Sequence, residues 1–188
     1  GIIRIILENK LNVDLDYLID LTEVKFDKTD LQLFLKERIA YYLTEKNYQK
    51  NVVKAVVQQY RLDLLPILPR VIAEITEFIS SEPGKKALAV YKRVSNLLSS
   101  NKKSLSFEEK ISEQHVTKED QILQEQLISS KEQVERSLQS KDFKTALFML
   151  GSMVGSVNQF LDNVQVNCED NALRSLRYAL LNEILQNM

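Results

Sequence analysis

The residues best suited to bind a ligand are six cations that follow Gly84. No acidic residue lies between Gly84 and Lys103, although the net charge of the whole chain is −1. On a helical projection of residues 85–99, at about 100° per residue, the polar side chains gather on one half. They are Lys85, Lys86, Lys92, Arg93 and Asn96, and Lys102 and Lys103 follow the projected segment. The other half is apolar and consists of Ala87, Leu88, Val90, Tyr91, Val94, Leu97 and Leu98.

A basic face of this kind favours phosphates, because each phosphate that a cation neutralises releases counterions. Asn96 adds an amide that can hydrogen-bond a base edge or a sugar. The same pattern also suits a solvated, lysine-rich helix face that binds nothing. The residues alone leave these two interpretations open.

Three arginines fall within or beside apolar helix faces. Arg177 lies inside the apolar arc of the last predicted helix and Arg174 lies at its edge. Arg38 lies inside an arc made of Phe34, Leu35, Tyr41 and Tyr42. Because a buried guanidinium must be paired, we expect Arg177 and Arg38 to join helices through carboxylates, with Asp162 and Asp170 as candidate partners. A role in which these arginines reach into a ligand groove stays open, and Arg174 is the better ligand candidate.

Gly151 and Gly155 are four residues apart in a predicted helix over 142–167, on the side that also carries Asn158 and Asp162. This spacing predicts that another helix backbone packs closely there. Asp162 could also present a polar group at the end of that helix, but packing is the favoured interpretation.

Catalytic and metal chemistry is poorly supported. His115 is the single histidine and Cys168 the single cysteine, so neither a zinc site nor a nucleophilic pair is indicated. There is no glycine-rich phosphate loop and no apolar run long enough to span a membrane. A lone cysteine suits a reducing compartment. An independent enzyme is the least supported class, and we expect no catalytic residue and no metal site here.

Helical periodicity dominates the 188 residues, which hold only four glycines and three prolines. We predict an all-α, multi-helix bundle of about seven to eight helices. The expected helices cover a short segment after 14, then about 31–45, 49–60, a proline-initiated helix ending near 80, 83–99, 119–139, 142–167 and 170–187. The polar break Asp27-Lys28-Thr29-Asp30 holds N-cap candidates, Asp142 and Asp170 are two more, and 100–118 is a predicted loop. Residues 1–7 are expected to be the end of a helix that begins before Gly1.

Four blocks carry a resemblance to a known family. The longest reads Gln159-Phe160-Leu161-Asp162-Asn163-Val164-Gln165-Val166-Asn167-Cys168-Glu169-Asp170, followed by Arg174, Arg177 and a leucine-rich helix end. The others are Lys92–Leu98, Gly1–Glu8, and Phe34–Arg38 with Asn47-Tyr48. In their order along the chain they resemble the C-terminal part of the beta subunit of bacterial glycyl-tRNA synthetases. The chain departs from the family at Leu176, where an asparagine is usual, so a polar contact expected there is in doubt.

This resemblance implies a DALR-like anticodon-binding bundle over about 83–188, within a tRNA-binding region over 26–188. Residues 1–25 would end a preceding helical module related to HD domains. The expected partners are glycine tRNA and the alpha subunit of a cytoplasmic alpha/beta enzyme, and neither DNA nor a membrane is expected. ATP and Mg would be used at the alpha subunit, and this fragment would hold no cofactor.

The tRNA contacts expected from these arguments are Lys85, Lys86, Lys92, Arg93, Asn96 and Arg174, and Arg38, Asp162 and Arg177 are structural or further contacts. The alternative is a helical scaffold that mainly docks the partner subunit and does not bind RNA directly.

Overall fold

The computed structural model describes residues 1–22, 27–59, 62–100 and 116–187. The chain divides into two compact units, Gly1–Glu77 and Phe78–Met188. The described residues form helices and no strand, so the predicted all-α class is confirmed. Lys102, Lys103 and His115, together with most of the predicted loop, lie outside the described residues.

The first unit contains short and long helices in succession. They are α1 (Ile2–Glu8), α2 (Leu15–Asp20), α3 (Lys28–Glu45), α4 (Lys50–Gln59), the 3₁₀ helix η1 (Leu62–Ile67) and α5 (Leu68–Ser80), which continues into the second unit. Asp27 caps α3, because its carboxylate accepts hydrogen bonds from the backbone N–H groups of Thr29 and Asp30. The cap is thus one residue of the predicted polar break, and α3 begins at Lys28 rather than near Leu31 as expected.

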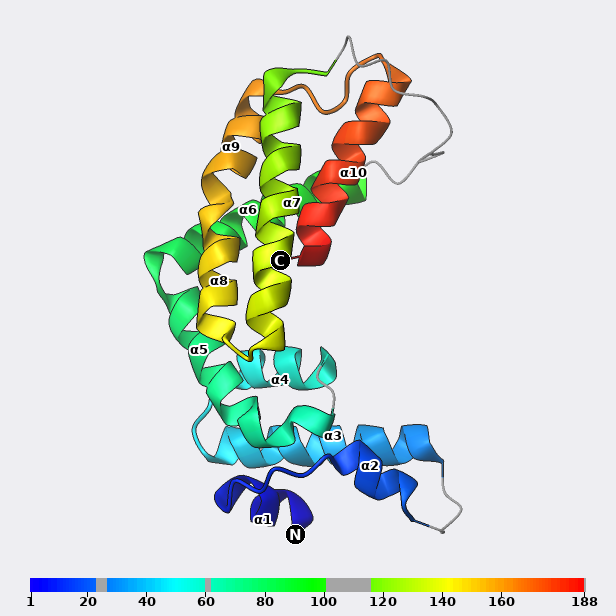
Figure 1. Ribbon diagram of the computed structural model, residues 1–188, viewed down its shortest axis with the longest axis vertical. Helices are drawn as coiled ribbons and strands as arrows, with labels where there is room; N and C mark the ends of the chain where they lie inside the picture. The colour runs from blue at the N-terminus through cyan, green and yellow to red at the C-terminus, as the bar shows by residue number, and fades with distance from the viewer. Residues whose placement is uncertain (23–26, 60–61, 101–115, 188) are drawn as a thin grey trace. The chain divides into compact units, whose positions relative to one another are not determined.

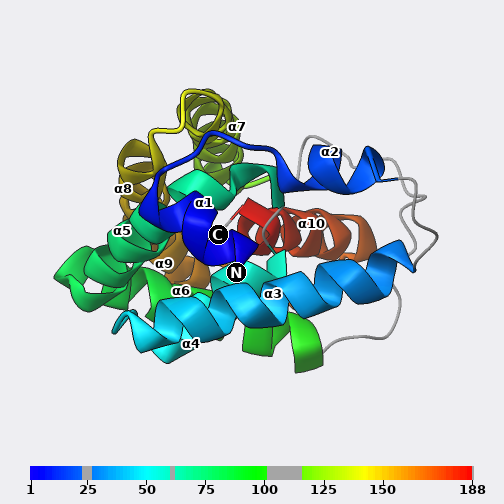
Figure 2. The same cartoon turned by 90° about the horizontal axis from the view of Figure 1, so that it is seen from below.

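Helix α3 organises the first unit, since it packs against both α1 and α4, while η1 contacts α1 and α2. Figure 2 shows α1 beside α3. The buried stripe of α3 is Leu35, Ile39 and Leu43. The predicted arc was wrong, because Phe34 is 49% exposed and Tyr41 is 60% exposed. Apolar residues surround this helix on nearly all sides, so the stripe that is buried depends on tertiary packing rather than on periodicity.

The second unit consists of the end of α5 and five further helical segments. They are α6 (Glu82–Ser100), α7 (Lys118–Gln139), α8 (Phe143–Ser152), α9 (Val154–Asn163) and α10 (Asn171–Asn187). Asp142 accepts a hydrogen bond from the Thr145 N–H and Asp170 from the Leu173 N–H, which confirms both predicted caps. The helix predicted over 142–167 is divided at Met153 and ends at Asn163.

Helices α8 and α9 follow one another along α7 (Figure 1), and α10 packs on α6 and α7. Their shared core is apolar. It includes Ala87, Val90, Val94, Leu123, Leu127, Val157, Phe160, Leu181 and Ile184, all buried. Because α6 gives one face to this core, its opposite face is left to solvent.

Glycine matters most at the start of α6. A Cβ at Gly84 would lie 1.8 Å from the backbone oxygen of Phe78, so only glycine lets the two segments approach this closely. At Gly151 a Cβ would meet the ring of Phe78 at 3.4 Å, and at Gly155 it would meet nothing within 4 Å. The close helix-backbone packing predicted around Gly151 and Gly155 was therefore wrong. The neighbours at Gly151 are the side chains of Phe78 and of Pro83, whose Cβ would lie 3.8 Å away.

Candidate functional site

The basic face of α6 is formed by Lys85, Lys86, Lys92, Arg93 and Asn96, and every one of these residues is exposed. The helix is held by Ala87, Val90 and Val94, which are at most 4% exposed and pack into the core of the second unit. The apolar half is buried only in part, because Leu88 is 50% exposed and Tyr91 is 42% exposed. The sequence pattern thus placed the polar half correctly and overstated the buried half.

Two members of the basic face have carboxylate partners. Lys85 Nζ lies 3.1 Å from Oε1 of Glu82, one turn earlier on the same helix. Arg93 Nη2 lies 2.8 Å from Oδ1 of Asp162 and donates to the backbone oxygen of Leu161 at 3.2 Å. Both side chains of the Arg93–Asp162 pair remain substantially exposed, so solvent screens this pair. Two predicted site residues from opposite ends of the second unit's sequence are thereby brought together at the end of α9.

Arg174 is half-buried at the beginning of α10. Its guanidinium donates to the backbone oxygen of Cys168 at 3.0 Å and to the side-chain oxygen of Asn171. These contacts hold the segment between α9 and α10 against the first turn of α10. The predicted role of Arg174 as a ligand residue stays a prediction, and any ligand would compete with these two contacts.

Arg177 is 4% exposed and forms the buried ion pair that the sequence argument required. Its Nε and Nη2 each lie 3.0 Å from an oxygen of Asp120, and Nη1 donates to the backbone oxygen of Gln165 at 2.9 Å. The expected partners were wrong. Asp162 instead pairs with Arg93, and Asp170 caps α10.

Asp120 is the residue that the sequence argument missed. It is 1% exposed, and its Oδ2 accepts hydrogen bonds from the N–H and the hydroxyl of Thr117, which caps α7. Burial raises the pKa of Asp120, but the hydrogen bonds from Arg177 and Thr117 outweigh it, and the pKa lies below its ordinary value. The Thr117–Asp120 spacing is a capping-box signal visible in the sequence. Nothing in that local signal indicates a partner 57 residues away.

Arg38 does not occupy a buried face. It is exposed on α3, and its guanidinium lies 5.1 Å from the ring centroid of Phe34. Arg38 belongs to the first unit, whereas the other predicted contacts belong to the second.

Among the residues that the structure describes, no group of three or more His, Cys, Asp or Glu side chains could hold a metal ion. No described helix is both long and apolar enough to cross a membrane. The chemistry offered by the α6 face is thus cationic and hydrogen-bonding, on a rigidly packed helix. Such a face is suited to bind a polyanion.

The profile of the DALR anticodon binding domain matches residues 87–188. The chain belongs to this family. The DALR match begins one residue after Lys86 and includes Lys92, Arg93, Asn96 and Arg174. It lies entirely within the second unit, which carries the basic face.

Curated relatives extend the similarity across almost the whole chain. A protein named glycine–tRNA ligase beta subunit from Rickettsia canadensis (strain McKiel) is 32% identical over 187 residues, which covers 96% of this chain and 27% of the relative. The protein of the same name from Rickettsia bellii (strain OSU 85-389) is 31% identical, with 98% and 27% covered. That from Dechloromonas aromatica (strain RCB) is 31% identical, with 96% and 26% covered. The chain thus spans about a quarter of the length of these relatives, and the family resemblance expected from the sequence is confirmed.

Proposed function

We propose that this chain is the tRNA-binding, anticodon-recognising portion of a glycine–tRNA ligase beta subunit. The observation that carries the proposal is the DALR match over a unit whose α6 presents Lys86, Lys92 and Arg93 to solvent. In this role the chain holds the tRNA, while glycylation driven by ATP and Mg takes place at an alpha subunit. The proposed setting is the cytoplasm, and the proposed limits remain 1–25 for an HD-related tail and 26–188 for tRNA binding.

Lysines suit the backbone contacts, because an ammonium group is a point charge that neutralises a phosphate without reading a base. Arg93 and Asn96 offer donors in fixed or planar geometry, which suits base edges. Arg93 already shares its guanidinium with Asp162 and Leu161, so a tRNA group would compete with these contacts. We assign the phosphates to Lys85, Lys86 and Lys92, and base discrimination to Arg93, Asn96 and, once released from its present contacts, Arg174.

A second function is favoured by a different observation. Helices α2 and α3 of the first unit expose large apolar side chains, with Tyr17 61%, Leu33 59% and Tyr41 60% exposed. Exposed apolar surface of this kind is typical of protein contacts. The alternative is therefore a scaffold that docks the alpha subunit and does not bind RNA directly.

The test is equilibrium binding of this chain to glycine tRNA and to a non-cognate tRNA, at low and at moderate salt. Anticodon recognition predicts tighter binding of the glycine tRNA and affinities that fall steeply with salt. Binding of purified alpha subunit without binding of either tRNA would favour the scaffold and reject the proposed function.

A further inference from the structure

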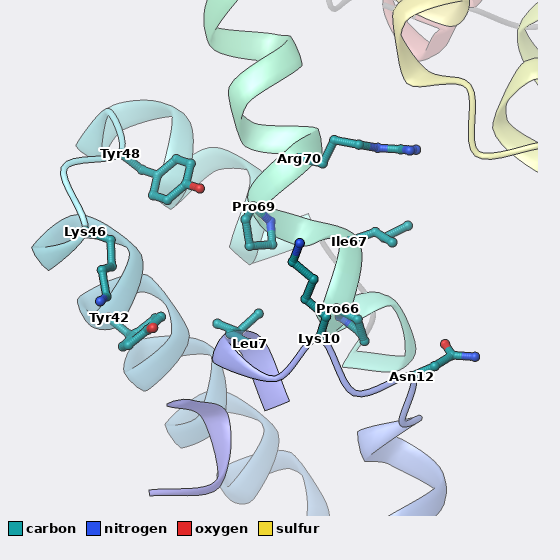
Figure 3. Close-up of a pocket in the computed structure, with 10 residues that line it drawn as sticks. All are labelled: Leu7, Lys10, Asn12, Tyr42, Lys46, Tyr48, Pro66, Ile67, Pro69 and Arg70. Carbon is teal, nitrogen blue, oxygen red and sulfur yellow. The ribbon is translucent and has the colours of Figure 1, made fainter. Parts of the chain in front are cut away.

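The first unit contains a pocket of about 750 Å³. The pocket lies outside the DALR match, and none of the residues that line it belongs to α6. It is formed where the end of α1, the end of α3 and the η1–α5 junction meet (Figure 3). It is lined by Leu7, Lys10, Asn12, Tyr42, Lys46, Tyr48, Pro66, Ile67, Pro69 and Arg70. Pockets of this volume commonly hold small organic ligands.

The lining combines flat apolar surface with positive charge. Tyr42 and Tyr48 are half-buried and contribute rings, and Pro69 adds a flat apolar wall beside them. Lys10, Lys46 and Arg70 contribute charge, and none of the ten lining residues is acidic. Rings beside cations suit a ligand that has an aromatic face and an anionic group.

Two of these cations have carboxylate partners, and Arg70 Nε lies 3.6 Å from Oε1 of Glu74. Glu8 lies 3.6 Å from Lys46 Nζ, but it also binds Arg4 Nε at 3.0 Å and accepts from the Tyr42 hydroxyl at 3.3 Å. Lys46 is 53% exposed on its side chain and also lies over the Tyr42 ring, 5.6 Å from its centroid. Its ammonium is therefore able to turn toward an anion in the pocket.

The backbone at the pocket is unusual. Lys10 has φ 51° and Asn47, which joins Lys46 to Tyr48, has φ 65°. This left-handed conformation is unfavourable for a lysine, and glycine would adopt it more readily. Figure 3 shows the Lys10 side chain extending toward Pro69, across the pocket. The conformation thus projects an ammonium group toward the apolar wall.

We propose that this pocket binds one nucleotide unit, with its base against Tyr48 and Pro69 and its phosphate at Lys10. A free mononucleotide and a nucleotide of a single-stranded RNA share this chemistry. The inference does not rest on the proposed function, because it concerns the first unit and is tested without tRNA.

The experiment measures binding of the chain to AMP, CMP, GMP and UMP, to inorganic phosphate and to three-nucleotide RNAs, by calorimetry. The expected result is that mononucleotides bind more tightly than inorganic phosphate. Tighter binding of the three-nucleotide RNAs would identify a strand as the source, and tighter binding of mononucleotides would identify the free ligand. No binding of any nucleotide, or equal binding of AMP and inorganic phosphate, would overturn the proposal.

Lys10→Gly removes the ammonium while relieving the left-handed strain, so the variant should fold at least as stably as the wild type. It should lose roughly ten-fold in nucleotide affinity, as expected for one charge-assisted contact. The matched control is Lys141→Gly, because Lys141 has φ 58° and lies in the second unit. Equal nucleotide affinity of the Lys10→Gly and Lys141→Gly variants would contradict the assignment.

Tyr48→Leu tests the proposed base contact separately from the phosphate contact. Base stacking on an aromatic ring predicts a loss of roughly 5- to 100-fold for nucleotides, with inorganic phosphate binding unchanged. A parallel loss for nucleotides and inorganic phosphate would contradict a stacked base.

Discussion

The guanidinium of Arg177 and the carboxylate of Asp120 form a buried, two-point ion pair, with Nε–Oδ1 and Nη2–Oδ2 distances of 3.0 Å each. The pair joins α10 to the first turn of α7. Through Nη1 and the backbone oxygen of Gln165 it also holds the segment between α9 and α10. One arginine thereby fixes three segments of the second unit.

Replacing this arginine should destabilise the second unit strongly. Arg177→Met leaves the Asp120 carboxylate buried without its cation, and we expect a loss of about 3–5 kcal/mol in the free energy of unfolding. Arg136→Met is the matched control, because Arg136 pairs with Glu132 on the surface, where a pair contributes less than about 1 kcal/mol. Urea unfolding of both variants measures the difference. Equal losses would show that the buried pair has no special role.

The same pair predicts acid sensitivity. The pKa of Asp120 is lower in the folded chain than in the unfolded chain, so the stabilisation is present above an unfolded pKa of about 3.9 and is lost as the pH falls through the folded value. Asp120→Asn removes this titration. The difference in Tm between wild type and Asp120→Asn should therefore be large at neutral pH and shrink as the pH falls below about 4. A difference that does not change with pH would contradict the lowered pKa.

Two glycines should respond oppositely to the same substitution. Gly84→Ala places a Cβ against the Phe78 carbonyl, and overpacking of this kind costs about 1–3 kcal/mol. Gly155→Ala meets nothing within 4 Å, and alanine favours a helix by up to about 1 kcal/mol. Thermal unfolding should show a lower Tm for the first and an unchanged or higher Tm for the second. Similar shifts would mean that backbone approach at Gly84 is not what requires glycine.

Much of this fold was predictable because its signals are local. Asp142 and Asp170 accept backbone hydrogen bonds at the helix starts where they were expected, and Asp27 does so within the polar break predicted over 27–30. The break at Met153 was not predictable, because its φ of −72° and ψ of −19° remain in the right-handed helical region and leave the apolar pattern almost unchanged. A small backbone change there divides one expected helix into α8 and α9.

The candidate site was predictable only where one helix determines it. The exposed half of α6 follows from periodicity within one helix. The partners of Arg93 and Arg177 could not be predicted, because Asp162 and Asp120 are distant in sequence and tertiary packing alone selects them. Asp162, once a candidate partner for Arg177, is instead the carboxylate that restrains Arg93.

This restraint leads to a prediction about affinity. Asp162→Asn removes a negative charge beside the α6 face and releases the Arg93 guanidinium, so binding of tRNA should tighten. Stability should change by less than about 1 kcal/mol, since both partners are exposed. The control is Glu132→Gln, which removes the same charge from the exposed pair with Arg136. If both variants bind tRNA equally, Asp162 does not restrain a tRNA contact.

Base discrimination by Arg93 has its own test. Arg93→Ala should reduce the ratio of affinities for glycine tRNA and a non-cognate tRNA, because arginine offers bidentate contacts to base edges. Equal losses of affinity for the two tRNAs would show that Arg93 contacts phosphate and does not read a base.

The most direct measurement compares two double variants that lose the same charge. Lys86→Ala/Lys92→Ala removes two exposed ammonium groups from α6, and Lys118→Ala/Lys144→Ala removes two exposed ones from α7 and α8. The affinity of each for glycine tRNA is measured over a range of salt. The account predicts that the α6 variant binds all tRNAs more weakly and that its salt slope falls by about 2, while the control stays near wild type. Equal behaviour of the two variants would contradict the claim that the basic face of α6 holds the tRNA.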